Sequence, residues 1–251
     1  MKALITGASS GIGYEMAKVL SEKGYDLILV ARRKKRLESL SKELKTNVEI
    51  YSYDLSSTFN CMKLYNKVKK ENIDVLINNA GFGVFGEFIE TNIDSELDLI
   101  DLNIKAVHVL TKLFLKDFSQ INYGYILNVA SSAGFMAGPL MASYYASKNY
   151  VLKLTEAINE ELRVNKSNVY VGALCPGPVN TEFNDVADVN FSVKALSPVY
   201  VAKYAADKMF KRKMIIIPGF KIKMACFMTR FMSTRSLLKM TYKIQKRKGS
   251  D

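Results

Sequence analysis

The amino-acid sequence predicts an α/β fold in which helices cover both faces of one parallel sheet. Short apolar runs rich in Val, Ile and Leu alternate with helical patterns. Uninterrupted apolar runs of this kind are typical of strands that are buried on both faces. A glycine-rich turn follows the first run directly. The 251 residues, 49% of them hydrophobic and 24% charged, fit one large globular domain and exclude a disordered chain.

Seven strands and six intervening helices are expected in chain order. The strands are predicted at Lys2–Thr6, Asp26–Ala31, Val48–Tyr53, Ile73–Ile77, Tyr125–Ala130, Val169–Leu174 and Met214–Ile217. The helices are predicted at Gly11–Lys23, Lys34–Leu44, Ser57–Lys70, Ser95–Phe118, Ser143–Arg163 and Val199–Lys211. This order predicts a doubly wound parallel sheet as one domain over residues 1–217, followed by a basic helical extension of that domain over residues 218–251.

The cysteine and histidine content excludes several classes of protein. Cys61, Cys175 and Cys226 are odd in number, widely spaced and outside any CxxC motif, so we expect reduced thiols in a cytoplasmic protein. His108 is the single histidine and lies in a predicted helix, so we expect no metal site. Acid–base chemistry must then come from Tyr, Lys, Asp, Glu or Cys.

We also expect that the protein neither spans a membrane nor is secreted. The sequence contains no run of 18 apolar residues, which predicts that no helix crosses a membrane. A strand-like run begins at Lys2, which predicts that no signal peptide is present.

The net charge of +12 belongs to one end of the chain. Residues 211–251 contain twelve Lys and Arg and one acid, whereas residues 1–210 contain 24 basic and 23 acidic residues. The nearly neutral body argues against a nucleic-acid partner, and any anionic partner would have to bind the tail.

The segment Thr6-Gly7-Ala8-Ser9-Ser10-Gly11-Ile12-Gly13 lies between the first strand and the first helix. Glycines are needed where a tight turn brings backbone close to a pyrophosphate at a helix N-terminus. An ordinary turn is the alternative, but the position favours a phosphate cradle. The candidate phosphate-binding residues are Gly7, Ser9, Ser10, Gly11, Ile12 and Gly13.

Arg32 and Arg33 follow the second strand, where a dinucleotide fold contacts the adenosine ribose. An acid there binds the 2′-hydroxyl of NAD, whereas Arg suits the 2′-phosphate of NADP, so we expect NADP(H). A solvated helix start is the alternative. Asp54 ends the third strand, where it would face the adenine or cap a helix. Asn79, Ala80 and Gly81 follow the fourth strand and suit a sharp turn against the cofactor.

Tyr144 and Lys148 form a YxxxK pair that shares one helix face. A nearby ammonium lowers the pKa of a tyrosine, which makes the phenol a usable acid or base. The same spacing occurs four more times, at Tyr14/Lys18, Tyr65/Lys69, Tyr204/Lys208 and Tyr242/Lys246. Only Tyr144 follows the fifth strand and has a serine, Ser131, thirteen residues before it. Asn103 is a polar candidate that would bend its helix around a water; a purely structural role is the alternative.

In this order, these motifs and Pro176-Gly177-Pro178-Val179-Asn180-Thr181 resemble the short-chain dehydrogenase/reductase family over about residues 1–217. The resemblance implies a Rossmann fold, a homodimer or homotetramer, and hydride transfer between NADP(H) and a carbonyl or alcohol. It implies a catalytic tetrad of Asn103, Ser131, Tyr144 and Lys148, with Tyr144 as the acid/base, Ser131 polarising the carbonyl, Lys148 binding the nicotinamide ribose and Asn103 holding a water. It also implies that Pro176, Gly177, Val179 and Thr181 contact the nicotinamide, and that Asn79 and Ala80 line the adenine-ribose side. A non-catalytic NADP-binding sensor or scaffold is the alternative.

The sequence gives less information about the chemical class of the substrate and about the role of the C-terminal segment. Phe135, Met136, Leu140, Met141, Phe183 and Phe191 would line an apolar pocket for a lipophilic carbonyl, although such residues are also ordinary packing. From residue 220 the chain forms a basic amphipathic pattern, with Phe220, Met224, Phe227, Phe231, Leu238 and Tyr242 on one stripe. A helix over the substrate mouth or at a subunit contact is one interpretation. A membrane-surface contact through residues 220–247 and attraction of an acidic substrate are the others.

Overall fold

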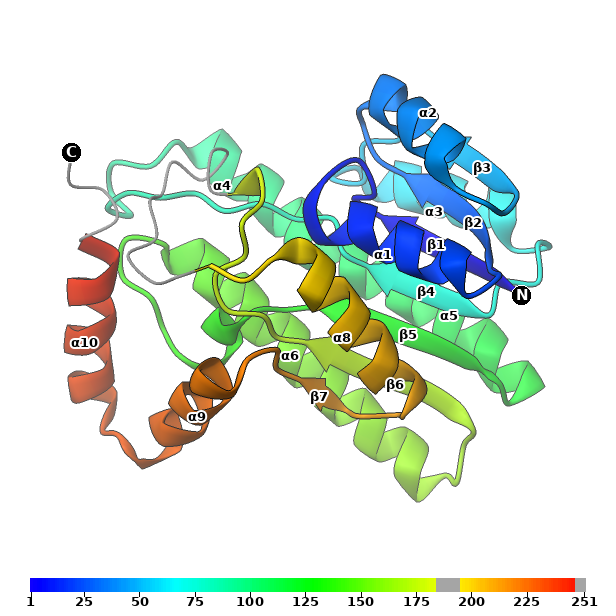
Figure 1. Cartoon of the computed structure of the whole chain (residues 1–251). Coiled ribbons are helices and arrows are strands. Elements are labelled where there is room, and N and C mark those ends of the chain that lie inside the picture. The colour runs from blue at the N-terminus through cyan, green and yellow to red at the C-terminus, as the bar shows by residue number, and fades with distance from the viewer. Residues whose placement is uncertain (184–194, 247–251) are drawn as a thin grey trace.

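The computed structural model describes residues 1–183 and 195–246, and in it the sheet is parallel throughout. Its seven strands pair in the order β3-β2-β1-β4-β5-β6-β7. The order of the strands therefore reverses between β1 and β4 (Figure 1), and in sheets of this kind ligands bind beside such a reversal at the carboxyl ends of the strands. The strands are β1 Lys2–Thr6, β2 Asp26–Val30, β3 Val48–Tyr51, β4 Val75–Asn78, β5 Gly124–Val129, β6 Val169–Leu174 and β7 Ile215–Ile216.

Helices cover both faces of this sheet, as predicted (Figure 1). One face packs against α1, α2 and α8, and the other packs against α3, α5 and α6. The helices are α1 Gly11–Glu22, α2 Lys34–Glu43, α3 Thr58–Val68, α4 Ile93–Ile100, α5 Val107–Ile121, α6 Ala142–Val164, α8 Pro198–Phe210, α9 Phe220–Met228 and α10 Thr234–Lys246.

The core is divided between the two faces because successive strand residues point to opposite sides. In β1, Leu4 packs with the helices of one face and Ile5 with those of the other, and neither is exposed. The continuous apolar runs of the sequence are thus explained by burial on both sides.

The helix predicted at Ser95–Phe118 is longer and is interrupted. It begins at Ile93, because the side chain of Asn92 accepts a hydrogen bond from the backbone N–H of Ser95 at 3.0 Å. Between α4 and α5, residues Asp101–Ala106 form a π-helical segment (η1) that contains Asn103. Such single-turn insertions are frequent at functional sites.

The C-terminal extension consists of α9, a short 3₁₀ turn (η3, Thr229–Phe231) and α10, and it lies beyond the carboxyl ends of the strands (Figure 1). The break near Ser233 and Thr234 divides the amphipathic pattern into two helices. This is the position at which the Ser233-Thr234 pair was expected to break the segment in two. Across residues 1–183 and 195–246, no helix has the length and apolar character needed to cross a membrane.

Four buried polar side chains connect β4 and β5 to the helices of one face. The amide nitrogen of Asn78 donates to Thr111 Oγ1 at 3.0 Å and to Asn128 Oδ1 at 2.9 Å. Thr111 Oγ1 also donates to Asn128 Oδ1 at 3.1 Å, and the amide nitrogen of Asn128 donates to Thr155 Oγ1 at 3.0 Å. Asn128 is thus the centre of the network, and all four residues are buried.

We expect Asn128→Ala to lower the free energy of unfolding by about 3 kcal/mol, because it removes three buried hydrogen bonds, those with Asn78, Thr111 and Thr155. Urea denaturation followed by circular dichroism measures this change. Asn66→Ala, at an exposed position of α3, is the matched control and should cost almost nothing. Equal stability of the two variants would contradict the structural importance of the network.

Candidate active site

Tyr144 lies in the first turn of α6 and its hydroxyl is hydrogen-bonded to Ser131. Ser131 follows β5 by two residues, and its Oγ also accepts a hydrogen bond from the N–H of Ala133 at 3.1 Å. The two hydroxyls therefore meet at the carboxyl end of the sheet. Burial raises the pKa of Tyr144 to about 12, and the hydrogen bond with Ser131 only partly opposes this effect.

Lys148 lies one turn further along α6 and is buried. Its Nζ donates to the carbonyl oxygen of Val129, the last residue of β5, at 2.9 Å, and lies 5.8 Å from the centroid of the Tyr144 ring. Burial lowers the pKa of Lys148 to about 8. The sequence predicted that this ammonium would lower the pKa of the phenol. In the structure, desolvation raises the pKa of Tyr144, and the group that opposes this shift is Ser131 and not Lys148.

Asn103 is fully buried in the π-helical segment. Its side-chain amide pairs with the backbone of Phe82, accepting from the N–H at 3.1 Å and donating to the carbonyl oxygen at 2.9 Å. It also donates to Ser147 Oγ at 3.1 Å, and Ser147 donates to the carbonyl oxygen of Tyr144 at 2.7 Å. The side chain of Asn103 thus holds the chain after β4 against the first turn of α6.

The glycine-rich turn between β1 and α1 lies against the end of β4. A Cβ on Gly7, which has a φ of +66°, would lie 2.8 Å from both Ala80 Cα and Asn79 Nδ2. A Cβ on Gly13 would collide with Asn79 Nδ2 and lie 2.5 Å from the carbonyl oxygen of Gly7. Glycine is therefore required at both positions by close approach of backbone.

Asn79 shapes the glycine-rich turn. Its side-chain amide donates to the carbonyl oxygens of Thr6 and Gly7 at 3.0 and 3.1 Å. Thr6 Oγ1 accepts in return from the backbone N–H groups of Asn79 and Ala80 at 2.9 and 3.1 Å. Gly81 lies beside Asn103, since a Cβ there would be 2.8 Å from Asn103 Oδ1.

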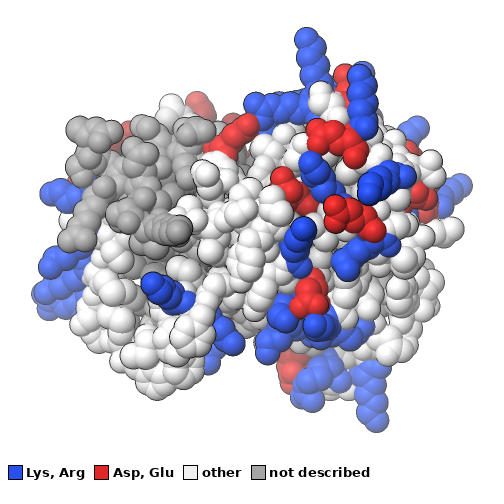
Figure 2. Space-filling view, viewed as in Figure 1, with Lys and Arg blue, Asp and Glu red and all other residues white. Residues whose placement is uncertain are grey.

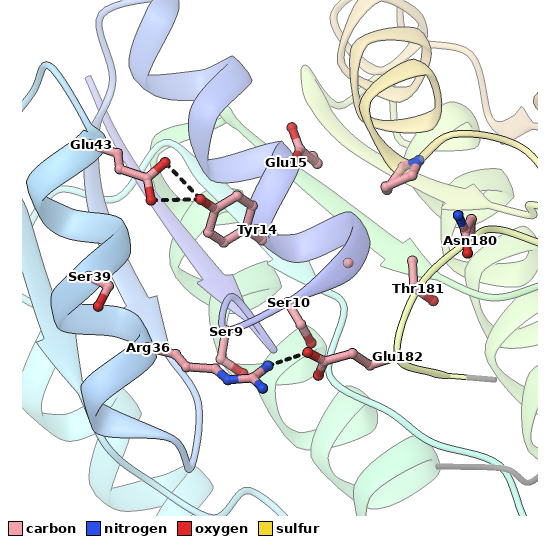
Figure 3. A pocket seen from close by; sticks show the side chains of 12 residues that line it. Ser9, Ser10, Tyr14, Glu15, Arg36, Ser39, Glu43, Asn180, Thr181 and Glu182 are labelled. Carbon is pink, nitrogen blue, oxygen red and sulfur yellow. Dashed lines mark hydrogen bonds and ion pairs between the residues drawn. The ribbon is translucent and has the colours of Figure 1, made fainter. Parts of the chain in front are cut away.

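Arg33 extends from the end of β2 over the glycine-rich turn. Its guanidinium donates to Ser9 Oγ at 2.9 and 3.1 Å and to Ser10 Oγ at 2.7 Å. Its remaining nitrogen pairs with Glu182 Oε2 at 2.7 Å, and Arg36 of α2 pairs with the other oxygen of Glu182 (Figure 3). The two arginines hold the pKa of the Glu182 carboxyl below its usual range. The Glu182 carboxylate is thus held by two guanidiniums, and Arg33 also binds the hydroxyls of Ser9 and Ser10.

Ser9, Ser10, Arg36 and Glu182 line a cavity of about 430 Å³ next to the N-terminus of α1 (Figure 3). Its lining comes from the glycine-rich turn, α1, α2 and the chain after β6. Neither Tyr144 nor Lys148 lines it, so this cavity belongs to the phosphate end of the crevice and not to the chemical end.

Arg32, which the sequence analysis favoured for the 2′-phosphate, pairs with Asp54 instead. Its side chain is 71% exposed and lies 3.8 Å from Asp54 Oδ2. Asp54 in turn accepts hydrogen bonds from the N–H and hydroxyl of Ser56, so it holds the turn before α3, whose N-cap is Ser57. Arg32 thus lies against Asp54, and Asp54 also accepts hydrogen bonds from the turn before α3.

The segment after β6 lines the crevice from the other side. Val179 pairs with Leu196 in an isolated parallel bridge, and the carbonyl oxygen of Pro176 accepts from the N–H of Ser132 at 2.8 Å. Thr181 lies against the glycine-rich turn, since a Cβ on Gly11 would be 3.0 Å from its methyl group. Likewise, a Cβ on Gly177 would lie 2.8 Å from the side chain of Ile222 in α9, so these two residues are in contact.

An apolar cluster surrounds the phenol. Met141, Phe183 and Phe85 pack with Tyr144 and Tyr145, and the Phe183 ring lies 5.2 Å from the Tyr144 ring. Met141 and Phe183 were predicted for this place, whereas Phe85 had no motif to indicate it. The prediction for Phe135 was wrong, because this side chain packs with the core around Val151 and Cys175. Phe191 lies outside the described residues; Met136 and Leu140 are half-buried near the cluster.

Among the remaining sequence candidates, Cys175 lies next to this group of side chains, because it interacts with Lys148 and with the backbone of Ser131. His108 Nδ1 is 2.6 Å from the hydroxyl of Tyr150 on the surface. Cys61, Cys175 and Cys226 are free and buried. No cluster of His, Cys, Asp or Glu that could hold a metal occurs in the described part of the chain.

The residues at the crevice fit a dinucleotide. The turn before α1 leaves no room for side chains at Gly7 and Gly13, and a helix N-terminus of this kind attracts phosphate. Arg33 and Ser9 lie at one end of this turn, while Tyr144, Ser131 and Lys148 lie at the carboxyl end of β5. An elongated ligand with an anionic end and a reactive end matches both.

Comparisons with known proteins agree with this geometry. A sequence model of the family described as short chain dehydrogenase matches residues 1–190. A 3-oxoacyl-[acyl-carrier-protein] reductase of Rickettsia prowazekii is 33% identical over 184 residues, covering 73% of this chain and 74% of that protein.

Two solved structures illustrate the similarity in fold. A short-chain dehydrogenase from Sphingobium yanoikuyae in complex with NADPH has a TM-score of 0.83 and 30% identity, covering 94% of this chain and 95% of that one. The bulky-bulky ketone specific alcohol dehydrogenase from Comamonas testosteroni has a TM-score of 0.77 and 29% identity, covering 92% of both chains. The nucleotide-type crevice, the hydrogen-bonded tyrosine and serine, and these matches place the chain in the short-chain dehydrogenase/reductase family of nicotinamide-dependent oxidoreductases.

Proposed function

We propose that this protein is an NADP(H)-dependent oxidoreductase that moves a hydride between nicotinamide and the carbonyl or alcohol carbon of a lipophilic substrate. The observation that carries the proposal is the hydrogen bond between Tyr144 and Ser131 at the carboxyl end of β5, one helical turn from the buried Lys148. Paired hydroxyls beside a buried cation provide an acid, a base and a donor to a carbonyl oxygen without histidine.

In this mechanism, a bound nicotinamide supplies or accepts the hydride. Tyr144 donates its phenolic proton to the carbonyl oxygen in the reductive direction and accepts the alcohol proton in the oxidative direction. Ser131 donates a hydrogen bond to the same oxygen and orients it. Lys148, placed under the Tyr144 ring, favours the phenolate that forms when the proton leaves. Asn103 acts at one remove, since its amide positions the first turn of α6.

Preference for NADP(H) is supported by the anion site on Arg33 and Arg36. A guanidinium already aimed at two serine hydroxyls and a carboxylate has the geometry to bind a 2′-phosphate. The related chain from Sphingobium yanoikuyae was solved with NADPH. We assign the 2′-phosphate to Arg33 rather than to Arg32, because Arg32 is turned toward Asp54.

A lipophilic substrate is supported by the apolar cluster of Met141, Phe183 and Phe85 next to the phenol. Related proteins are described as acting on bulky ketones and on 3-oxoacyl groups, which are carbonyls with apolar substituents. A cytoplasmic, homo-oligomeric protein completes the proposal; three free, buried thiols support a reducing compartment.

Removal of the phenolic hydroxyl should abolish turnover. We expect Tyr144→Phe to lower kcat at least about a hundredfold while the Kd for NADPH is unchanged, because the proton donor is lost but the binding surface is kept. NADPH absorbance with a carbonyl panel measures kcat, and fluorescence titration measures Kd. Tyr204→Phe is the matched control, since Tyr204 and Lys208 repeat the YxxxK spacing on α8. Full turnover by Tyr144→Phe would contradict the assigned acid.

Removal of the Arg33 guanidinium should reduce discrimination between the two cofactors. We expect Arg33→Ala to raise the Kd for NADPH about tenfold to a hundredfold and to leave the Kd for NADH unchanged, because a charge-assisted contact to the 2′-phosphate is lost. Fluorescence titration with each cofactor measures both constants.

Two variants serve as controls for this titration. Arg32→Ala should alter neither constant by more than the error. Glu182→Gln removes the carboxylate that pairs with Arg33 and Arg36, so it should tighten NADPH binding roughly two- to fivefold. Loss of NADPH affinity in Arg32→Ala instead would assign the phosphate to that residue.

Buried Lys148 should reduce the stability of the folded chain. Its pKa is about 8 when folded and 10.5 as a free side chain, so the unfolded chain binds more protons between these values and stability rises with pH across this range. Below pH 8 the cost is constant and amounts to as much as about 3 kcal/mol. We therefore expect Lys148→Met to be more stable than the parent at pH 7, with the gain shrinking toward pH 10.5.

Urea denaturation at pH 7, 9 and 10 measures this difference. Lys153→Met, at an exposed position on the same helix, should show no pH-dependent gain. A gain in Lys148→Met that is the same at every pH would show that the ammonium is not what destabilises the fold.

A further inference from the structure

The exposed side of α9 and η3 carries large apolar side chains that no part of the described chain covers. Phe220 is 76% exposed and Phe231 is 71% exposed, and the Phe227 and Phe231 rings pack together 5.3 Å apart. Met224 and Met228 are also exposed. Soluble proteins rarely present such a group of adjacent apolar side chains without a partner. We define the α9 surface as Phe220, Met224, Phe227, Met228 and Phe231.

The opposite side of α9 is anchored to the domain, which fixes the direction in which this surface points. Ile222 contacts Gly177 in the chain after β6, and Cys226 is buried. In α10, Gln245 is fully buried and its amide donates to the hydroxyl of Tyr145, next to the catalytic tyrosine. The extension therefore packs on the carboxyl-end side of the sheet and presents the α9 surface outward, beside the chemical end of the site.

The border of the α9 surface is cationic. Lys221, Lys223 and Arg230 are exposed and, within residues 1–183 and 195–246, none of them pairs with a carboxylate. The sequence contains no Asp or Glu from residue 208 to residue 250. Figure 2 shows mainly uncharged atoms over α9 with isolated Lys and Arg side chains, whereas carboxylates gather with cations over α1, α2 and α8.

We propose that the α9 surface binds an anionic membrane surface. Aromatic and methionine side chains flanked by lysines are the pattern of a helix that lies in the interface, with the apolar side chains among the acyl chains and the ammonium groups at the headgroups. Each cation near an anionic leaflet contributes roughly a fivefold factor to partitioning. Nucleic acid is less favoured, because thioether side chains such as Met224 and Met228 do not stack on bases.

This inference depends on the surface alone and not on the proposed reaction. It would place the apolar cluster around Tyr144 next to a lipid phase in which apolar carbonyl compounds dissolve. The reaction can be tested without vesicles, so failure of membrane binding would leave the proposed oxidoreductase unaffected.

The absence of tryptophan from the chain makes a direct test simple. Phe231→Trp introduces a single tryptophan on the α9 surface, and Phe59→Trp introduces one at a position of α3 that is 72% exposed. The probes are vesicles of phosphatidylcholine with and without about one-third phosphatidylglycerol. We expect a blue shift of Trp emission only for Phe231→Trp and only with the anionic vesicles, and its reversal in high salt.

Charge reversal supplies the second arm. The full chain carrying Lys221→Glu, Lys223→Glu and Arg230→Glu should lose at least about a hundredfold in its partition coefficient, measured by co-sedimentation. Reversal of three exposed lysines elsewhere, Lys70, Lys112 and Lys166, is the matched control and should lose far less. Unchanged NADPH affinity in both triple variants shows that each is folded.

Three results would overturn the proposal. The first is a full chain that stays in the supernatant with anionic vesicles. The second is equal binding by the two triple variants. The third is light scattering in which substitution of the α9 surface dissociates a dimer, which would identify a second copy of this chain as its occupant.

Discussion

The site depends on hydrogen bonds from side-chain amides, which fix the chain at the carboxyl ends of β1, β4 and β5. Parallel strands end where their backbone ladder ends, so the first residues beyond them need other partners. Asn79 supplies two hydrogen bonds to the carbonyls of the glycine-rich turn, and Asn103 pairs with the backbone of Phe82. Asn128 connects the interior of the same strands to α5 and α6. In the irregular chain beyond the strands, amide side chains thus supply the hydrogen bonds that neighbouring strands supply within the sheet.

The buried positions of Tyr144 and Lys148 disfavour the charged form of each side chain. Burial raises the pKa of Tyr144 and lowers the pKa of Lys148, so the neutral forms of both are favoured by the same apolar surroundings. The low dielectric that disfavours each charge alone also strengthens the attraction between phenolate and ammonium. The fold therefore holds a pair whose members are costly separately and favourable together, as catalytic sites commonly do.

The sequence predicted the order of strands and helices along the chain because buried parallel strands leave an unambiguous apolar pattern. It also singled out Tyr144 among five YxxxK pairs, since only that pair follows β5. It favoured Arg32 over Arg33 for the 2′-phosphate and could not tell which side chain faces the glycine-rich turn, because neighbouring residues at a strand end point in opposite directions and the periodicity stops there. Phe85 and Glu182 were missed for a related reason: both lie in irregular chain, where no period reports which way a side chain points.

Glu182 shows how closely the two ends of the site are connected. Three consecutive residues contact three different parts: Thr181 lies against Gly11, Glu182 pairs with Arg33 and Arg36, and Phe183 packs on Tyr144. Adjacent Cα atoms are only about 3.8 Å apart, so a backbone shift that frees Glu182 must also move Phe183 or Thr181. A rotation of the Glu182 side chain alone would free the arginines without disturbing the phenol. An anion that takes the place of the Glu182 carboxylate at Arg33 and Arg36 therefore needs only this side-chain rotation, and Phe183 keeps its contact with Tyr144.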